Sequence, residues 1–223
     1  MNLIIFDCDG TLVDSLAVQL ETMRRTLEEL GHRPVPDSAI RRLIGVSLPE
    51  TFSILFDKPI DDYILRTVVR FKEHYHDVAA AMERKAIPYA GIAEALHELS
   101  RRDDVLMGVA TGKSRRGLVD LLADEGWEDH FVALRTADDC PSKPHPAMVL
   151  EICDHCGIAP SRTLVIGDTS FDMKMAVNAG AMGLGVSWGF HAPHELTQAG
   201  ATHVLETPAE LVPYFGEIGF ARI

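Results

Sequence analysis

The chain of 223 residues carries 21 lysine and arginine residues against 33 aspartate and glutamate residues, which gives a formal net charge of −12 at pH 7. This acidic balance argues against a nucleic-acid binder and against a protein that docks on an anionic membrane, because both surfaces attract clustered Lys and Arg. With 47% hydrophobic and 24% charged residues, the composition is that of a globular protein large enough to bury a substantial core.

The sequence also predicts a cytoplasmic protein. No apolar run reaches the roughly 20 residues that a membrane-spanning helix needs. The N-terminal segment has no basic region and meets Asp7 too early for a signal peptide. Four cysteines are too few for a disulfide scaffold in a chain of this length. We therefore expect neither nucleic acid nor a membrane as a partner, and a monomer or a homodimer as the assembly.

The first predicted strand, residues 3–6, is followed by a long helical region. Apolar residues repeat at helical spacing from Leu16 to Leu30, and a second stripe runs from Ile64 to Met82. No strand-like run separates the two stripes, so we expect an all-helical cap domain inserted into a core domain. The expected domains are the cap at 16–85 and the core at 1–15 and 86–223.

Within this insert, Ser47 and Glu50 have the spacing of a capping box at a helix start. The two crossings between insert and core, near residues 13–17 and 84–90, form a natural hinge. The alternative arrangement is a set of extra helices packed flat on the sheet. Because stripes of this length can build a core of their own, the separate domain is favoured.

After the insert, short apolar runs alternate with segments of helical spacing. Such runs are typical of strands buried on both faces, as in a parallel sheet. Their alternation with helices predicts an open, Rossmann-like α/β sheet. The expected strands are 105–110, 131–134 (the weakest), 163–166 and 182–186, the expected helices are 91–101, 114–125, 146–156 and 170–179, and a last strand and helix lie around 202–215.

Polar loops follow the predicted strands or precede the predicted helices. In open α/β sheets ligands bind at the carboxyl ends of the strands, so we expect these loops to converge on one crevice. One polar loop after a buried strand is common, whereas four loops with complementary groups are a strong signal. The loops are residues 7–11, 111–114, 142–146 and 167–172.

The converging loops carry four aspartates, and carboxylates at contact distance repel one another unless a cation lies among them. Oxygen ligands favour a hard ion, and Mg²⁺ keeps several waters and bridges to phosphate groups. Thr111 adds a hydroxyl and backbone amides at a helix start, which form an anion site, and Lys143 adds one positive charge. Together they describe a phosphoryl-transfer site with a carboxylate as the natural nucleophile. The four aspartates are Asp7, Asp9, Asp168 and Asp172.

These motifs resemble those of the haloacid dehalogenase-like hydrolase superfamily, and specifically its phosphoglycolate phosphatase-like branch. Residues 7–15 match the first motif, Thr111 the second, Lys143 the third and residues 167–172 the fourth. The helical cap after the first motif also matches, so the resemblance covers essentially the whole chain. It implies a Mg²⁺-dependent phosphatase that hydrolyses a small phosphorylated metabolite, with phosphoglycolate as a candidate, through an aspartyl-phosphate intermediate.

The resemblance also implies a role for each motif residue. Asp7 would attack phosphorus, and Asp9 would protonate the leaving oxygen and then deprotonate the hydrolytic water. Mg²⁺ would be bound by Asp7, the backbone carbonyl of Asp9, and Asp168. Asp172 would act through water or orient these ligands. The phosphoryl oxygens would contact Thr111, Lys143 and the backbone at Cys8, Gly10 and Gly112.

Two other functions stay open. A phosphomutase of the β-phosphoglucomutase type has a histidine and basic residues in its cap, where this sequence has Gln19, Ile44 and Leu48. The absence of these groups favours simple hydrolysis. A non-hydrolytic scaffold would keep its aspartyl-phosphate as a signal, which the intact Asp9 disfavours. Dehalogenation is disfavoured as well, because the halide-releasing relatives lack this second aspartate.

The cap is expected to decide substrate specificity. Arg42 and Gly45 lie, with Arg41 and Ser47, around a predicted loop between helices that can face the crevice. For each arginine, a solvated charge on a helix surface is equally expected. Lys113 is either a neighbour of the phosphate or a surface residue at a helix start.

Two further clusters have the residue types of a metal site. Cys153 and Cys156 follow helical spacing and lack a second pair, so they are expected in the core rather than on zinc. Pro193 lies between His191 and His194, and this indicates a helix start rather than a pair of ligands.

Overall fold

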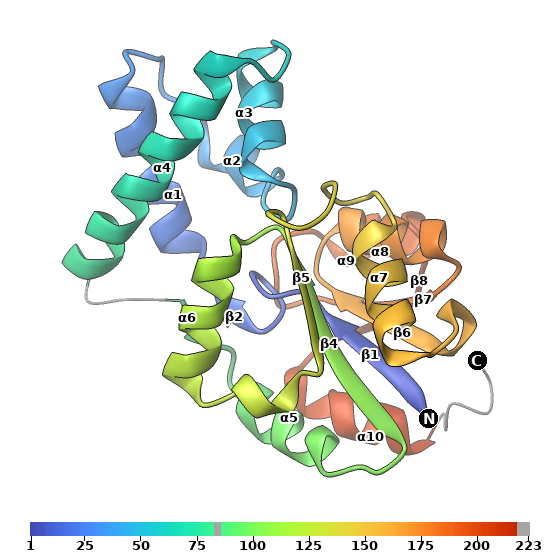
Figure 1. Cartoon of the computed structure of the whole chain (residues 1–223). Coiled ribbons are helices and arrows are strands. Elements are labelled where there is room, and N and C mark those ends of the chain that lie inside the picture. Colours follow the sequence, from blue (N-terminus) through green and yellow to red (C-terminus); the bar gives the residue numbers. More distant parts are fainter. Residues whose placement is uncertain (83–85, 218–223) are drawn as a thin grey trace.

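Six strands form the central sheet of the computed structural model, which describes residues 1–82 and 86–217 (Figure 1). The strands are β1 (Asn2–Phe6), β4 (Val105–Thr111), β5 (Ala133–Thr136), β6 (Thr163–Gly167), β7 (Met182–Val186) and β8 (Ala201–Leu205). All neighbours are parallel, in the order β5-β4-β1-β6-β7-β8. The first strand therefore lies inside the sheet, between β4 and β6.

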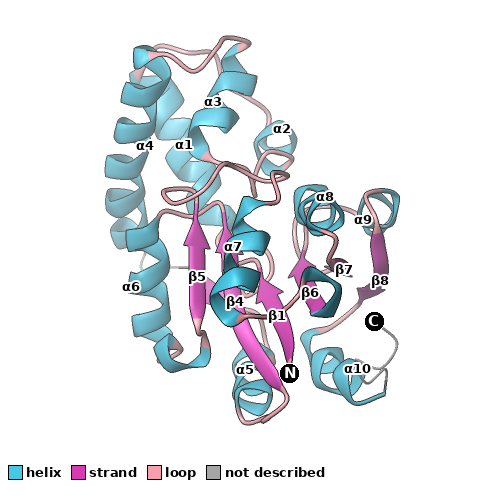
Figure 2. Cartoon of the chain, turned by 45° about the vertical axis from the view of Figure 1, so that its right-hand side comes forward, coloured by secondary structure: helices cyan, strands magenta, loops and turns pink. Residues whose placement is uncertain are grey.

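Helices cover both faces of this sheet (Figure 2). Ile4 and Phe6 of β1 pack into the core on one face, and Leu3 and Ile5 pack into the core on the other. The sequences of the strands are nearly continuous apolar runs because both faces of each strand are buried. The first face is covered by α5 (Ile92–Ser100), α6 (Arg115–Glu125) and α10 (Leu211–Glu217), and the second by α7 (Ala147–Cys156) and α8 (Ser170–Ala179).

The predicted open α/β sheet is confirmed. The helices α5 to α8 begin and end within one residue of their predicted bounds. The edge strand β5 was predicted two residues too early, because Phe131 packs into the core before strand pairing begins at Ala133, opposite Gly108. The remaining short elements are α9 (Pro193–Gln198) and the 3₁₀ turns Glu128–His130, Pro160–Arg162 and Pro208–Glu210.

Four helices follow the first strand and lie beyond the carboxyl ends of the sheet strands (Figures 1 and 2). They are α1 (Leu16–Glu29), α2 (Asp37–Arg41), α3 (Leu48–Phe56) and α4 (Asp62–Ala81), called here the helical insert. Their apolar stripes meet in a cluster separate from the two sheet cores. This cluster contains Met23, Leu27, Ile40, Phe52, Ile64, Val68 and Phe71.

The chain enters and leaves the insert through two short strands, β2 (Val13–Asp14) and β3 (Ile87–Pro88). They pair antiparallel, with Val13 opposite Pro88 and Asp14 opposite Ile87. The two crossings predicted from the sequence therefore lie side by side. Residues 84 and 85 of the second crossing, with the predicted cap boundary at 85, lie outside the described residues.

The capping residues expected from the sequence are only partly observed at the helix starts of the insert. Asp61 caps α4, because its side chain accepts a hydrogen bond of 2.9 Å from the Ile64 amide. The predicted capping box at Ser47 is wrong: α3 begins there, but the Ser47 side chain makes no capping bond. Its backbone N–H instead donates to Ser142 Oγ at 2.8 Å, so a contact with a distant loop replaces the local motif.

Two smaller predictions are confirmed. Helix α9 begins at Pro193, as the proline indicated. Cys140 and Cys153 are buried in the second sheet core with Cys156 packed against it, and all four cysteines are free. Among the helices of residues 1–82 and 86–217, none is both long enough and apolar enough to cross a bilayer.

Candidate active site

The polar loops meet at the carboxyl ends of three neighbouring strands. Asp7 follows β1 directly, Thr111 ends β4, and Asp168 follows β6. Since β4 and β6 flank β1, the sheet order alone brings these residues to one edge. Lys143 reaches the same place from the loop before α7. The predicted convergence of the four loops is therefore observed.

Lys143 is fully buried between two carboxylates. Its Nζ lies 2.7 Å from Asp7 Oδ1 and 2.6 Å from Asp172 Oδ1. Burial works to lower the pKa of Lys143, but the carboxylates of Asp172 and Asp7 outweigh it and raise that pKa above its ordinary value. The lysine is therefore a permanent cation that fixes the positions of two carboxylates.

Asp7, Asp168 and Asp172 offer carboxylate oxygens that all lie within 4.8 Å of one another, and all three residues are buried. Burial raises the pKa of Asp7 to about 7, against the lowering influence of Lys143 and with added repulsion from Asp172. Burial, together with repulsion from Asp7 and Asp172, raises the pKa of Asp168 well above its usual range. One ammonium does not balance three carboxylates.

This donor set fits a divalent cation. Asp7 Oδ2 is buried and makes no hydrogen bond of ordinary geometry with the described residues. A cation among three carboxylates removes the repulsion that raises the pKa of two of them. All the donors are oxygens, which hard ions prefer. The cluster can therefore hold a metal ion, as the sequence predicted.

Asp168 is held by backbone and side-chain donors around it. Thr11 Oγ1 donates to its Oδ1 at 2.9 Å, and the Phe190 amide donates to its Oδ2 at 2.8 Å. Gly10 has a φ of +91°, and a Cβ there would lie only 2.2 Å from Asp168 Oδ2. Only glycine allows the first loop to approach this carboxylate so closely.

The two oxygens of Asp172 have different partners. Oδ1 accepts from Lys143, while Oδ2 accepts from the Thr169 amide at 3.1 Å and from the Thr169 hydroxyl at 2.6 Å. Thr169 and Asp172 together form the capping box that begins α8. Asp172 is therefore suited to orient Lys143, while its expected role toward the metal ligands stays a prediction.

The carboxylate of Asp9 lies outside the group formed by the other three aspartates, contrary to the expectation of four adjacent carboxyl groups. The chain bends directly after Asp7, so the alternation of an extended strand does not continue. Asp9 Oδ1 lies 3.0 Å from Lys113 Nζ, and both side chains are almost buried. Lys113 is therefore a partner of Asp9 rather than a surface residue. Its backbone N–H donates to Thr111 Oγ1 at 3.2 Å.

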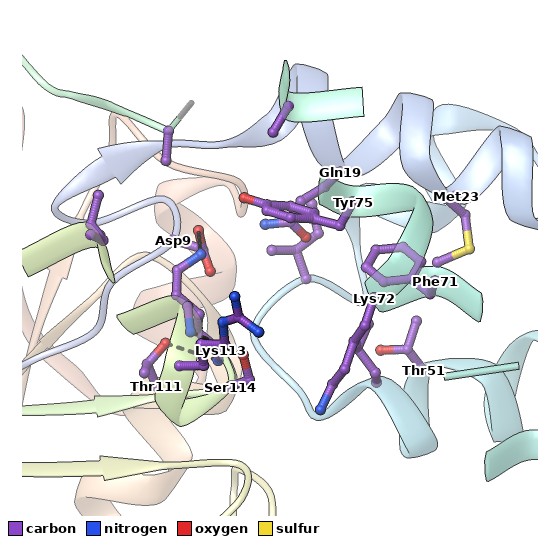
Figure 3. Close-up of a pocket in the computed structure, with 18 of the residues that line it drawn as sticks. Asp9, Gln19, Met23, Thr51, Phe71, Lys72, Tyr75, Thr111, Lys113 and Ser114 are labelled. Carbon is purple, nitrogen blue, oxygen red and sulfur yellow. Dashed lines mark hydrogen bonds and ion pairs between the residues drawn. The ribbon is translucent and has the colours of Figure 1, made fainter. Parts of the chain in front are cut away.

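A cavity of about 620 Å³ opens from these loops toward the helical insert. Figure 3 shows Asp9, Thr111 and Lys113 on its core side and side chains of α1 and α4 on the other. Asp7, Gly45 and Gly112 also line it. The carboxylate site thus connects to a partly open cavity between insert and sheet.

A family model of haloacid dehalogenase-like hydrolases matches residues 4–186. The chain belongs to this family. The resemblance seen in the motifs is thereby confirmed, and it extends over the helical insert and the sheet strands up to β7.

Individual relatives match over nearly their full length. The chain is 30% identical to a probable phosphatase IndB of Dickeya dadantii, over 94% of this chain and 91% of that protein. It is 27% identical to a phosphoglycolate phosphatase of Psychrobacter arcticus, over 96% and 95% of the two chains. The crystal structure of a hydrolase from Pseudomonas syringae superimposes with a TM-score of 0.84 at 27% identity, covering 98% and 99%.

In this haloacid dehalogenase-like hydrolase, the loop of the helical insert at Gly45 and Val46 approaches the core loops through its backbone. A Cβ on Gly112 would lie 2.9 Å from the Gly45 carbonyl oxygen and 3.0 Å from that of Val46. A Cβ on Gly45 would lie 3.2 Å from Thr169 Oγ1. The expected position of Gly45 at the crevice is therefore observed, next to the residue that caps α8.

Arg42, by contrast, does not line the cavity. Its guanidinium donates to Glu195 Oε1 at 3.0 Å, and its side chain is 73% exposed. Arg41 turns to the same side, where it donates to the Gly189 carbonyl oxygen at 2.8 Å. The expectation that Arg42 contacts substrate is not supported, because acceptors on the core hold both arginines outside the pocket.

Sequence reasoning missed several groups that shape this site. Thr11 and Phe190 hold Asp168. His191 accepts from the Ser170 amide through Nδ1 at 3.1 Å, and its Nε2 lies 3.3 Å from the Arg42 carbonyl oxygen, so it connects α8 to the insert. Thr11 could have been identified as the last residue of the first predicted loop. His191 was noted only beside a predicted helix start, and nothing in the local sequence indicates that Phe190 or His191 contacts the site.

Proposed function

We propose that this hydrolase is a Mg²⁺-dependent phosphatase that releases phosphate from a small phosphorylated metabolite through an aspartyl-phosphate on Asp7. The observation that carries the proposal is the buried Asp7 carboxylate, 2.7 Å from Lys143 and within 4.8 Å of the oxygens of Asp168 and Asp172. Membership of a hydrolase family and similarity to proteins named phosphatases support it.

In the first step, a carboxylate oxygen of Asp7 attacks phosphorus, and the bond from phosphorus to the leaving oxygen breaks. Asp9 gives its proton to that oxygen, so the product leaves as a neutral alcohol. Lys143 neutralises the developing charge on the phosphoryl oxygens, and Thr111 donates a hydrogen bond to them. The Cys8 amide and the close backbone approach that Gly10 and Gly112 allow complete the contacts with the phosphoryl group, while the Gly10 amide itself donates to the Val13 carbonyl oxygen at 2.8 Å.

In the second step, the ionised Asp9 takes a proton from water while the water oxygen attacks phosphorus. The bond from phosphorus to the Asp7 oxygen breaks, and inorganic phosphate leaves. Asp9 is again protonated and Asp7 is again a free carboxylate. Lys113, 3.0 Å from Asp9, acts as a positioning residue because its ammonium holds the carboxylate toward the cavity.

Mg²⁺ would be held by Asp7, the backbone carbonyl of Asp9, and Asp168, while Asp172 orients Lys143. When bound, it supplies positive charge that draws the phosphoryl group in and offsets the charge of the transition state. The pKa of Asp7, about 7 without metal, implies that protons compete with Mg²⁺ for this carboxylate, because metals bind the ionised form.

We expect Mg²⁺, at 100 times its Kd, to raise the thermal unfolding midpoint by about 5–10 °C at pH 8. The increase should be smaller at pH 6, where Asp7 is protonated in the metal-free protein. Asp168→Asn should remove the increase, and Asp154→Asn, at an exposed site on α7, should leave it intact. A midpoint that does not respond to Mg²⁺ at pH 8 would contradict the metal assignment.

The helical insert is proposed to act as a cap domain, residues 16–85, that closes on a core of residues 1–15 and 86–223 about the paired strands β2 and β3. Gly112→Ala tests this, because its Cβ would meet the carbonyl oxygens of Gly45 and Val46 at 2.9 and 3.0 Å. We expect kcat/KM to fall roughly 10- to 100-fold, with a larger radius of gyration in solution scattering.

The control for this variant is Gly117→Ala on α6. Its Cβ would meet side chains rather than backbone, namely the Ser114 hydroxyl at 3.2 Å and the Lys113 stem at 3.4 and 3.6 Å. Alanine favours helix over glycine, so the radius of gyration should match that of the unmodified protein. If Gly112→Ala also behaved like the unmodified protein, closure by this contact would be wrong.

A phosphomutase is the second candidate, and the cavity argues against it. Gln19, Ile44 and Leu48 all line the cavity, so the positions where mutases carry basic groups are uncharged here. A mutase would isomerise a sugar phosphate without releasing phosphate. A phospho-aspartate scaffold would instead retain a long-lived phosphoenzyme.

Phosphate release across a panel of metabolites, with and without Mg²⁺, tests the proposed activity. Phosphoglycolate belongs in that panel because the motifs resemble those of the phosphoglycolate phosphatase-like branch. Release from at least one compound only with Mg²⁺ is the expected result, and no release from any compound would refute the phosphatase. The cytoplasmic location and the monomeric or dimeric state stay predictions.

A further inference from the structure

The cavity has more room than a phosphoryl group fills. Its volume of about 620 Å³ lies in the range of about 300–1,000 Å³ in which proteins enclose drug-sized ligands. Asp9 and Thr111 lie at one side, and Met23 and Phe71 lie at the other (Figure 3). With the phosphoryl group at Asp7, the leaving alcohol must extend toward the helical insert.

The insert side of this cavity is largely apolar, and two of its residues are aromatic. Tyr75 extends from α4 toward the core side in Figure 3, and its ring centroid lies 5.8 Å from Lys113 Nζ. It therefore stands where the phosphoryl end meets the apolar wall. Gln19 and Thr51 add neutral polar groups. The apolar wall includes Met23, Ile40, Ile44, Leu48, Phe71 and Tyr75.

The charges around the cavity oppose a second anionic group on the substrate. Among the described residues that line it, six are aspartate or glutamate and three are lysine or arginine. Each of these three cations lies beside a carboxylate. A further anion would have to displace the almost buried pair of Lys113 and Asp9, whereas Lys72 and Arg116 are exposed, so solvent screens their attraction for it. The pairs are Lys113–Asp9 at 3.0 Å, Lys72–Asp138 at 3.6 Å and Arg116–Asp120 at 3.7 Å.

We infer, on the basis of the phosphatase activity proposed above, that the substrate is a phosphate monoester whose alcohol part is uncharged and presents an aromatic face to Tyr75. Phosphoglycolate is then a poor substrate, because the almost buried Lys113 is already paired with Asp9 and the short chain of phosphoglycolate leaves the apolar wall uncovered. The same reasoning disfavours pyrophosphate and bisphosphorylated sugars.

Matched alkyl phosphates separate size from charge. We expect 2-phenylethyl phosphate to have a kcat/KM at least roughly tenfold above those of ethyl phosphate, phosphoglycolate and 2-(4-carboxyphenyl)ethyl phosphate, all with saturating Mg²⁺. The last compound has the same ring and the same leaving oxygen as the first, so it isolates the added charge. A kcat/KM for phosphoglycolate or the carboxylated ring equal to or above that of 2-phenylethyl phosphate would overturn the inference while leaving the phosphatase intact.

Tyr75 supplies the matched variants. The ratio of kcat/KM for 2-phenylethyl phosphate to that for ethyl phosphate should fall roughly tenfold in Tyr75→Ala and be retained in Tyr75→Phe, which keeps the ring. A purely structural role for Tyr75 would lower both values together and leave the ratio unchanged, which would contradict the inference. Failure to release phosphate from every compound would instead refute the proposed phosphatase, and this substrate assignment with it.

Discussion

Asp7→Asn is expected to lower the rate of phosphate release by about 10⁴-fold or more, the scale on which removal of a nucleophile acts. The amide occupies the same volume but cannot attack phosphorus or carry the phosphoryl group. Lys143 keeps Asp172 as a partner at 2.6 Å, so the variant should fold. Steady-state phosphate release in Mg²⁺, together with intact-protein mass spectrometry of quenched reactions, measures both the rate and the covalent phosphate.

Asp57→Asn is the matched control, because it makes the same chemical change at an exposed residue in the helical insert. Asp57 has a φ of +50°, a conformation that asparagine also tolerates, so this variant should behave like the unmodified protein. Near-normal turnover by Asp7→Asn, or a covalent phosphate on it, would show that Asp7 is not the nucleophile.

Lys143→Met is expected to remove both activity and stability. The loss of the cation leaves buried carboxylates of Asp7 and Asp172 without their shared partner, and breaking a buried ion pair in this way costs about 3–5 kcal/mol of unfolding free energy. Activity should fall by roughly 10²–10³, as when a preorganised electrostatic group is removed. Urea denaturation at pH 8 and phosphate release measure the two effects.

A double variant separates these effects. Lys143→Met with Asp172→Asn removes one of the unpaired carboxylates, so part of the lost unfolding free energy should return while activity stays low. Lys174→Met, at an exposed position on α8, is the control and should leave both quantities unchanged. If Lys143→Met alone were as stable as the unmodified protein, the buried ion pairs would not stabilise the fold as argued.

The fold could be predicted from the sequence wherever local pattern and burial agree. Strand β1 is apolar from Leu3 to Phe6 because Leu3 and Ile5 enter one core while Ile4 and Phe6 enter the other. The edge strand β5 was misplaced because its bounds depend on pairing with β4, which begins opposite Gly108. The apolar character of the segment does not show at which residue this pairing begins.

The candidate site could likewise be predicted only in part from the sequence. The motifs identify Asp7, Lys143 and Asp168, because each follows or precedes an element that the sequence predicts well. The partners of site residues come from segments far away in the chain and were missed. The missed contacts include those of Phe190 with Asp168, Lys113 with Asp9, Glu195 with Arg42 and Ser142 with Ser47.

The pairing of β2 with β3 has a consequence for how substrate preference can change. Asp14 and Ile87 lie opposite each other, so the points where the chain departs from the core and returns to it are neighbours. A short turn could join them, as in any hairpin, without displacing a strand of the large sheet. The segment between them can accordingly be lengthened, shortened or exchanged as a unit while Asp7, Lys143 and Asp168 keep their positions. For the proposed phosphatase, this means that new alcohol groups can be accepted while the residues of the proposed chemistry stay the same.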